Sequence, residues 1–188
     1  MKSLILASGS PRRKELMHLL PWTFEVKIKE VVEVICDSLS PEKNVQALAY
    51  QKANAVAEDY QEHIVIGADT VVCLQGEIMG KPHDKIHAKS MLEQLSGKVH
   101  EVYTGVAIIA KDKGISETFY VQTKVRMQSL SMNEIESYLL TNEPFDKAGA
   151  YGIQGYGARY IESIEGDFYN VMGLPVHALY EQLKKRLK

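Results

Sequence analysis

Small polar and cationic residues follow the first apolar segment of the chain. Residues 4–7 (LILA) precede the segment SGSPRR at 8–13. The Ser-Pro pair in this segment is typical of a helix N-cap and first helical position, so both arginines fall in the first helical turn. Hydroxyls, free backbone N–H groups and two guanidinium groups together suit a polyphosphate. The pattern favours phosphate binding by Ser8, Arg12 and Arg13 over a solvated charge pair beside an ordinary turn.

Acidic residues follow the second apolar segment and also occupy an earlier loop. Residues 63–68 (HIVIGA) predict a buried strand, with Asp69 and Thr70 at its end. Ligands of α/β folds bind at the carboxyl ends of strands, where Asp69 can hold Mg²⁺ or deprotonate water. An aspartate that merely caps a turn is an equal alternative. Glu30 and Glu33 offer further oxygen ligands for Mg²⁺ or Mn²⁺, although such a loop is more often only solvated.

Two lysines and a glutamine complete the polar candidates. Lys52 is expected on the inner side of a helix, where it either extends to solvent or meets an anion. Lys81, in the sequence GKP, either reaches a phosphate or is a surface lysine in a turn, and its spacing favours the surface lysine. The preceding glycines do not form a P-loop, because one residue is missing and Pro82 replaces the Ser or Thr. Gln154 lies in the glycine-rich segment 149–155 and either reads a base or belongs to a plain turn.

Strands and helices alternate in the first half of the chain, and a β meander occupies the middle. Predicted strands cover 4–7, 23–28, 63–68, 99–110, 115–128 and 159–164. Predicted helices begin after Ser10, Ser40 and Asp84 and cover 131–140 and 175–187. The pattern predicts an α/β protein with mixed α+β character at its centre, in which helices flank a mixed sheet. A single domain over residues 1–188 is expected.

Composition restricts the classes of function. The 188 residues are 45% hydrophobic and 24% charged, with a net charge of −2 and a pI near 6.3. These values argue against a strongly cationic protein that binds a nucleic acid polymer or a membrane surface. Cys36 and Cys73 make no disulfide framework, and no apolar run approaches the roughly 20 residues of a membrane span. A reducing cytoplasm is the simplest expected compartment.

The segments together resemble the Maf family of nucleoside triphosphate pyrophosphatases, once named for septum-formation inhibition. The resemblance covers nearly the whole chain in the family's order, and the motifs are specific jointly rather than singly. The matching segments are ASGSPRRKEL (7–16), EVVE (30–33), QKANAVA (51–57), GADTVV (67–72), GKP (80–82), SGKVHEVYTG (96–105), DKAGAYGIQG (146–155) and GDFYNVMGLP (166–175).

The resemblance implies a fold shared with inosine triphosphatases, namely an elongated mixed sheet with two lobes around a cleft, often in a homodimer. It also implies metal-dependent hydrolysis between the α and β phosphates. On this basis we expect Mg²⁺ or Mn²⁺ on Asp69 and Glu33, and we assign catalysis to Asp69, Glu33 and Lys81. The expected substrate-binding residues are Ser8, Arg12, Arg13, Lys52, Thr70 and Gln154.

Three positions separate two branches of the family by base. The branch that acts on 7-methyl-GTP carries Trp, Gln and Glu where this chain has Arg12, Thr70 and Gln154. These residues resemble the branch that acts on dTTP and UTP. The Gln154 amide can pair with both N3–H and a carbonyl of thymine or uracil, whereas a carboxylate would face a carbonyl. Such a mispaired buried group costs about 1–3 kcal/mol.

Two other functions fit parts of the sequence. A nucleotidyltransferase has a similar first strand and glycine-rich loop, although Pro11 interrupts its usual Gly-x-Gly-x-Arg pattern. A nucleotide-binding regulator of cell division would bind without turnover. The sequence does not distinguish ordinary dTTP and UTP from modified pyrimidine nucleotides.

Overall fold

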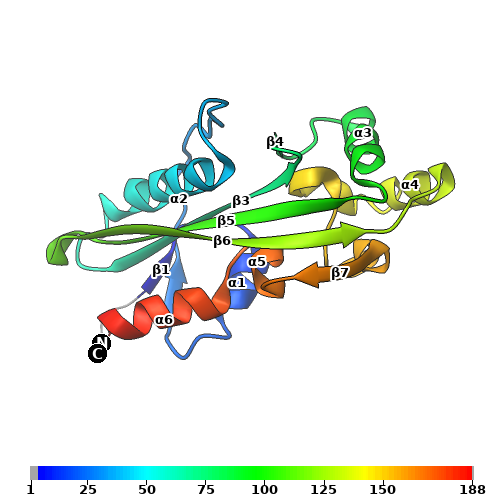
Figure 1. Cartoon of the computed structure of the whole chain (residues 1–188). Helices are drawn as coiled ribbons and strands as arrows, with labels where there is room; N and C mark the ends of the chain where they lie inside the picture. Colours follow the sequence, from blue (N-terminus) through cyan, green and yellow to red (C-terminus); the bar gives the residue numbers. More distant parts are fainter. Residues whose placement is uncertain (1–3, 188) are drawn as a thin grey trace. The chain divides into compact units, whose positions relative to one another are not determined.

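A computed structural model describes residues 4–187 and contains one mixed sheet (Figure 1). Its strands are β1 (Leu4–Leu6), β2 (Phe24–Val26), β3 (Ile64–Leu74), β4 (Glu77–Met79), β5 (Val99–Ala110), β6 (Ile115–Met127) and β7 (Ile161–Glu165). Among the described residues the sheet has seven strands in the order β2-β1-β3-β5-β6-β7, and β4 pairs with β3. Strand β1 is parallel to β2 and β3, whereas the β3–β4 and β6–β7 pairs are antiparallel. The predicted mixed α/β class is therefore confirmed.

Helices begin at the residues that local capping predicts. They are α1 (Pro11–Met17), α2 (Pro41–Ala57), α3 (Lys85–Leu95), α4 (Met132–Leu139), α5 (Phe168–Met172) and α6 (Val176–Arg186). The Ser10 hydroxyl accepts a hydrogen bond from the N–H of Arg13, and a capping box closes the start of α4. Helix α5 was not predicted. The strand expected from residue 159 begins only at Ile161, because residues 155–160 form a 3₁₀ helix.

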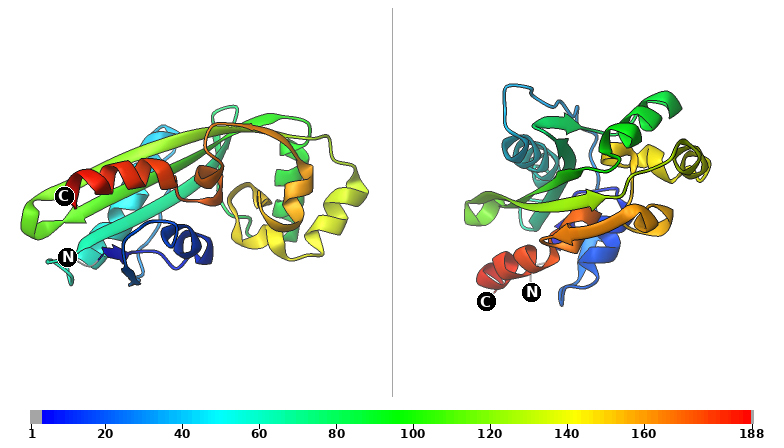
Figure 2. Two further views of the ribbon diagram at one scale, coloured as in Figure 1. Left: turned by 90° about the horizontal axis from the view of Figure 1, so that it is seen from below. Right: turned by 45° about the vertical axis from the view of Figure 1, so that its right-hand side comes forward.

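The chain forms two compact units. Unit 1 comprises residues 4–70, 104–121 and 173–187, and unit 2 comprises residues 71–103 and 122–172. Strands β3, β5 and β6 contribute residues to both units, and Figure 2 shows β5 and β6 from two further directions.

In unit 1, helix α2 covers one face of the sheet, and α1 and α6 lie on the opposite face (Figures 1 and 2). Ala49 and Ala53 of α2 pack against Ile5 of β1 and Val65 of β3. Gly67 makes this packing close, because a Cβ there would clash with the Ala49 carbonyl. The close approach of α2 to β3 brings the middle of the helix near residues 67–70, the last residues of β3 that belong to unit 1.

In unit 2, helices α3 and α4 and the segment 148–151 enclose an apolar core. Leu92 of α3 and Tyr138 of α4 are fully buried, and Ala150 and Tyr151 belong to the same cluster. No helix among residues 4–187 is long and apolar enough to cross a membrane.

Candidate active site

A lysine and two carboxylates meet in unit 1. Helix α2 carries Lys52, β3 carries Asp69, and the connection before α2 carries Glu33. The Lys52 Nζ lies 2.6 Å from Asp69 Oδ1 and 2.9 Å from Glu33 Oε2. The side chains of Lys52 and Asp69 are 15% and 10% exposed, whereas that of Glu33 is 52% exposed. Lys52 therefore contacts anionic groups, here two carboxylates, rather than extending into solvent.

The chemistry of this cluster suits a hard divalent cation. Both carboxylates contact the same ammonium nitrogen, so their oxygens converge on one small region at the border of the solvent. Within residues 4–187 no group of three or more His, Cys, Asp or Glu side chains is arranged to hold a metal. Two carboxylates are the number that Mg²⁺ often takes from a protein, since it keeps water molecules and binds substrate phosphates. The residues present fit Mg²⁺ or Mn²⁺.

Arg13 joins three parts of unit 1 that are distant in sequence. Its Nε donates to the Gly173 carbonyl at 2.8 Å. One terminal nitrogen donates to the Ala68 carbonyl at 2.8 Å and to the Ser8 hydroxyl at 3.3 Å. The other donates to the Thr70 hydroxyl at 3.0 Å. Arg13 thus holds the residues on both sides of Asp69.

These bonds change what Arg13 can offer to a ligand. A guanidinium has five N–H donors, and protein acceptors occupy four of those of Arg13. Burial lowers the pKa of Arg13, and the negative charge of Asp69 partly opposes this shift. An arginine stays protonated under such conditions, so Arg13 brings positive charge and rigidity to the site. Its neighbour Arg12 is half-buried in the same helical turn.

Hydroxyl groups surround the Arg13 guanidinium. The side chain of Ser8 is buried and accepts a hydrogen bond from the backbone N–H of Ser10 as well as from Arg13. The Thr70 hydroxyl lies 2.9 Å from the hydroxyl of Thr104, which is fully buried on β5. Sequence analysis gave Thr104 no role, although it lies in the segment SGKVHEVYTG (96–105), because its partner Thr70 lies on another strand.

Helix α2 also fixes the connection that carries Glu33. The buried Asn44 side chain accepts from the backbone N–H of Cys36 and donates to its carbonyl, at 2.8 and 3.0 Å. Gln51 donates to the carbonyl of Val32 at 3.0 Å. Two side chains of α2 therefore hold the backbone on both sides of Glu33. Sequence analysis gave neither residue a role: Gln51 begins the segment QKANAVA (51–57) and Asn44 lies outside the matching segments, and neither pattern indicates which backbone group the side chain binds.

Two predicted residues, Lys81 and Gln154, belong to unit 2. Both side chains are exposed. Lys81 follows β4, next to Gly80, whose carbonyl accepts a hydrogen bond from the N–H of Gly149 at 3.0 Å. The GKP turn therefore touches the glycine-rich segment that carries Gln154. These contacts leave the roles of the two side chains as predictions.

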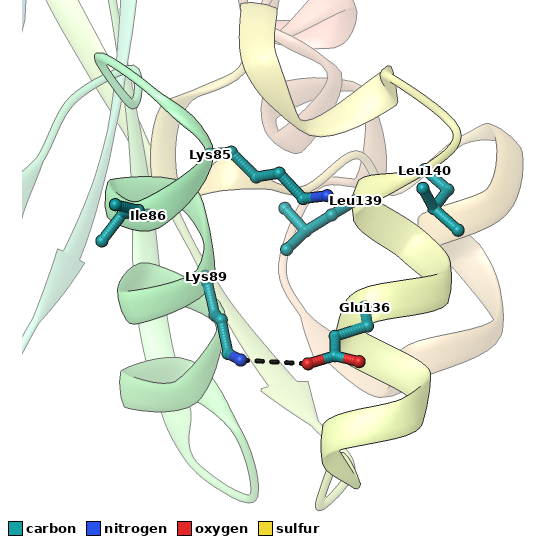
Figure 3. Close-up of a pocket in the computed structure, with 6 residues that line it drawn as sticks. All are labelled: Lys85, Ile86, Lys89, Glu136, Leu139 and Leu140. Atoms are coloured by element: carbon teal, nitrogen blue, oxygen red, sulfur yellow. Dashed lines mark hydrogen bonds and ion pairs between the residues drawn. The ribbon is translucent and has the colours of Figure 1, made fainter.

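A pocket of about 340 Å³ opens between α3 and α4 of unit 2 (Figure 3). Lys89 and Glu136 form an ion pair across it at 3.1 Å. The residues that line it are Lys85, Ile86, Lys89, Glu136, Leu139 and Leu140. None of the predicted site residues lines this pocket, so it plays no part in the assignment of the active site.

Comparison with known proteins agrees with the family resemblance. The family described as "Maf-like protein" matches residues 3–186. A Bacillus cereus protein named dTTP/UTP pyrophosphatase is 54% identical over 185 residues, which cover 98% of this chain and 90% of the relative. A Bacillus anthracis protein of the same name is also 54% identical, over 98% of this chain and 96% of the relative.

Similarity to a solved structure concerns the fold. The Staphylococcus aureus Ham1 protein superimposes with a TM-score of 0.52 and 15% sequence identity, covering 85% of this chain and 80% of that protein. The family match over nearly the whole chain, together with the relatives, is decisive: the chain belongs to the Maf family.

Proposed function

We propose that this protein hydrolyses dTTP and UTP between the α and β phosphates, releasing a nucleoside monophosphate and pyrophosphate. The observation that carries the proposal is the 54% identity, over 98% of the chain, to relatives named dTTP/UTP pyrophosphatase. The cluster of Lys52, Asp69 and Glu33 supports it, since it places two carboxylates beside one cation. Asp69 lies inside β3 rather than after it, because the strand expected to end at residue 68 continues to Leu74.

Asp69 is the general base in this proposal. Lys52 binds its Oδ1 at 2.6 Å and fixes the carboxylate, and Arg13 holds the Ala68 carbonyl and the Thr70 hydroxyl on either side. Asp69 takes a proton from a water molecule as the water oxygen bonds to phosphorus at the α–β anhydride. The attacked atom is the α phosphorus, so its bond to the α–β bridging oxygen breaks and the electron pair leaves on pyrophosphate. A positioned base contributes about 10²–10⁴-fold to such a step.

Cationic side chains offset the charge of the triphosphate. Arg12 and Lys52 of unit 1 are half-buried, and Lys81 of unit 2 is exposed. We assign phosphate binding to these three residues, and the role of Lys81 rests on its place in the family motif. Preorganised cations stabilise the negative charge that grows on a leaving pyrophosphate. Arg13 contributes its charge and its hold on Ser8 and Thr70 rather than a free pair of donors.

A divalent cation completes the proposed site. Asp69 and Glu33 would hold Mg²⁺ or Mn²⁺, and the bound cation would neutralise phosphate charge. The convergence of the two carboxylates on Lys52 Nζ supports this assignment. The half-exposed side chain of Glu33 leaves room for water and phosphate oxygens as further ligands.

Base selection is assigned to Thr70 and Gln154, on the resemblance to the dTTP/UTP branch. The Thr70 hydroxyl already contacts Arg13 and Thr104, so we assign it to shaping the site rather than to direct reading of the base. Gln154 is exposed, which leaves its amide available for a pyrimidine.

A homodimer in a reducing cytoplasm is also proposed. The dimer rests on the family resemblance and is tested by sedimentation of the purified protein. The compartment is supported by Cys36 and Cys73, which form no disulfide, and Cys36 is exposed.

A panel of nucleoside triphosphates, assayed for pyrophosphate release with Mg²⁺ and with Mn²⁺, tests the function. We expect dTTP and UTP to exceed the purine nucleotides, and Asp69→Asn to lower kcat at least about a hundredfold. Asp59→Asn is the matched control, because Asp59 pairs with Lys29 at 2.7 Å on the surface of the same unit. Turnover of Asp69→Asn equal to that control would refute the assignment. Consumption of UTP only with a sugar phosphate would identify a nucleotidyltransferase instead.

A further inference from the structure

A carboxylate of unit 2 binds the backbone beyond Gln154. Glu143 lies in a 3₁₀ turn (Glu143–Asp146) and is half-buried. Its Oε2 accepts from the backbone N–H of Tyr156 at 2.8 Å, and its Oε1 accepts from that of Gly157 at 3.0 Å. Hydrogen bonds to an ionised group are stronger than those between neutral groups. Glu143 therefore fixes the backbone two and three residues after Gln154.

A buried tyrosine extends this contact to the residues before Gln154. Tyr138 of α4 is fully buried, and its hydroxyl donates to Glu143 Oε1 at 2.8 Å. The same hydroxyl oxygen accepts from the backbone N–H of Gly152 at 3.0 Å. Burial, reinforced by Glu143, raises the pKa of Tyr138, so the hydroxyl keeps the proton that it donates. The backbone is thus held on both sides of Gln154, at residues 152 and 156.

The glycines of the segment fit closely around these two side chains. Gly155 has a φ of +72°, and a Cβ there would clash with Glu143 Oε2. A Cβ at Gly157 would clash with the Gly152 carbonyl oxygen and would lie 2.6 Å from the Tyr138 hydroxyl oxygen. Side chains at either position would displace the carboxylate or the phenol. The sequence GIQGYG at 152–157 is therefore shaped to receive the Glu143–Tyr138 pair.

We propose that Glu143 is a positioning residue for base selection: with Tyr138, it fixes the backbone of residues 152–157 so that the Gln154 amide is presented in one orientation. This inference rests on the proposed function, in which Gln154 reads the pyrimidine. Glu143 does not touch the substrate in this proposal. It acts by limiting the positions that the Gln154 amide can adopt, and a loosely held amide would pair with a base less selectively.

Glu143→Gln tests the proposal, because glutamine keeps the shape but loses the charge. We expect the ratio of kcat/KM for dTTP over GTP to fall about tenfold, equivalent to about 1.4 kcal/mol. The change should appear mainly in KM for dTTP, with kcat little altered. Tyr138→Phe, which removes only the hydroxyl, should reduce the ratio in the same direction. Glu134→Gln is the matched control, since the Glu134 carboxylate binds the backbone N–H of Ser131 in the same unit.

A double-mutant cycle with Gln154→Ala separates positioning from general structure. If Glu143 acts through Gln154, the double variant Glu143→Gln/Gln154→Ala has the same ratio of kcat/KM for dTTP over GTP as Gln154→Ala alone. Additive effects, or an unchanged ratio in both Glu143→Gln and Tyr138→Phe, would overturn the inference. An equal fall in turnover of every nucleotide would also overturn it, because that is the result of a structural role alone.

Amide hydrogen exchange separates this inference from the proposed function. Glu143→Gln should speed exchange at residues 152–157 relative to the wild type and to Glu134→Gln. If the wild-type protein prefers a base other than thymine or uracil, the proposed substrates are wrong. The positioning role of Glu143 then predicts that Glu143→Gln reduces the preference for that other base. Unchanged exchange at 152–157 in the variant would overturn the inference whatever the substrate is.

Discussion

Replacing Lys52 by methionine is expected to destabilise the protein by about 3 kcal/mol at neutral pH. The Lys52 and Asp69 side chains are only 15% and 10% exposed, and their charged atoms lie 2.6 Å apart. Removing one partner of a buried ion pair costs about 3–5 kcal/mol, because the other charge stays buried. We take the lower value, since Glu33, the second partner, is half-exposed and can be solvated by water.

Urea denaturation of four proteins measures this energy: the wild type, Lys52→Met, Asp69→Asn and the double variant. The expected loss corresponds to a fall in Tm of about 6–12 °C for a chain of this length. The double variant should recover most of the stability, because it leaves no unpaired charge at either position. Lys29→Met is the matched control and should cost less than about 1 kcal/mol, since Lys29 and Asp59 are both well exposed. Costs that add in the double variant, or a Lys52→Met cost no larger than the control, would refute the reasoning.

Two further variants test the hydrogen bonds of Arg13 and the burial of His100, which lies on β5, is fully buried and contacts the Tyr151 hydroxyl at 2.7 Å. Arg13→Lys keeps the charge but loses the two terminal guanidinium nitrogens that bind the Ala68 carbonyl and the Thr70 hydroxyl. We therefore expect kcat to fall about tenfold or more with KM nearly unchanged. An unaltered kcat in steady-state kinetics would contradict this. Burial lowers the pKa of His100 to about 4, below the value near 6.5 of an unfolded chain. The unfolded state then binds more protons between these values, so the free energy of unfolding should fall by about 3 kcal/mol as pH drops from 6.5 to 4. Above pH 6.5 this group should have no effect. In urea melts between pH 4 and 6.5, the free energy of unfolding of His100→Gln should depend less on pH than that of the wild type. An identical pH dependence in the variant would show that other groups cause it.

Local sequence determined where most helices begin. Ser10 before Pro11 and Asp84 at the start of α3 each bind a backbone N–H within three residues, so the signal and the contact lie in the same short segment. The capping box at the start of α4 follows the same logic. Helix α5 was missed because five residues carry too little periodicity to stand out from a loop.

Sequence patterns also indicated some of the polar residues that meet in unit 1. The apolar run before Asp69 and the apolar positions around Lys52 placed both residues where α2 packs on the sheet, although β3 continues past Asp69 to Leu74. Their contact follows from the close packing of α2 on β3 at Gly67. The family motifs added Glu33, which composition and spacing alone would have left as a solvated carboxylate.

The tertiary structure alone decided how the other polar groups are used. The sequence predicts Arg13 as a cation available to phosphate. In the structure three of its four partners lie 55 to 160 residues away, and together the partners occupy most of its donors. Asn44 and Glu143 gave no signal, because each binds backbone groups that only the folded chain brings near. Helix caps and apolar periodicity are properties of neighbouring residues and can be read along the chain. The partner of a buried side chain depends on which distant segments pack together, and that is fixed only when the sheet and its helices have assembled.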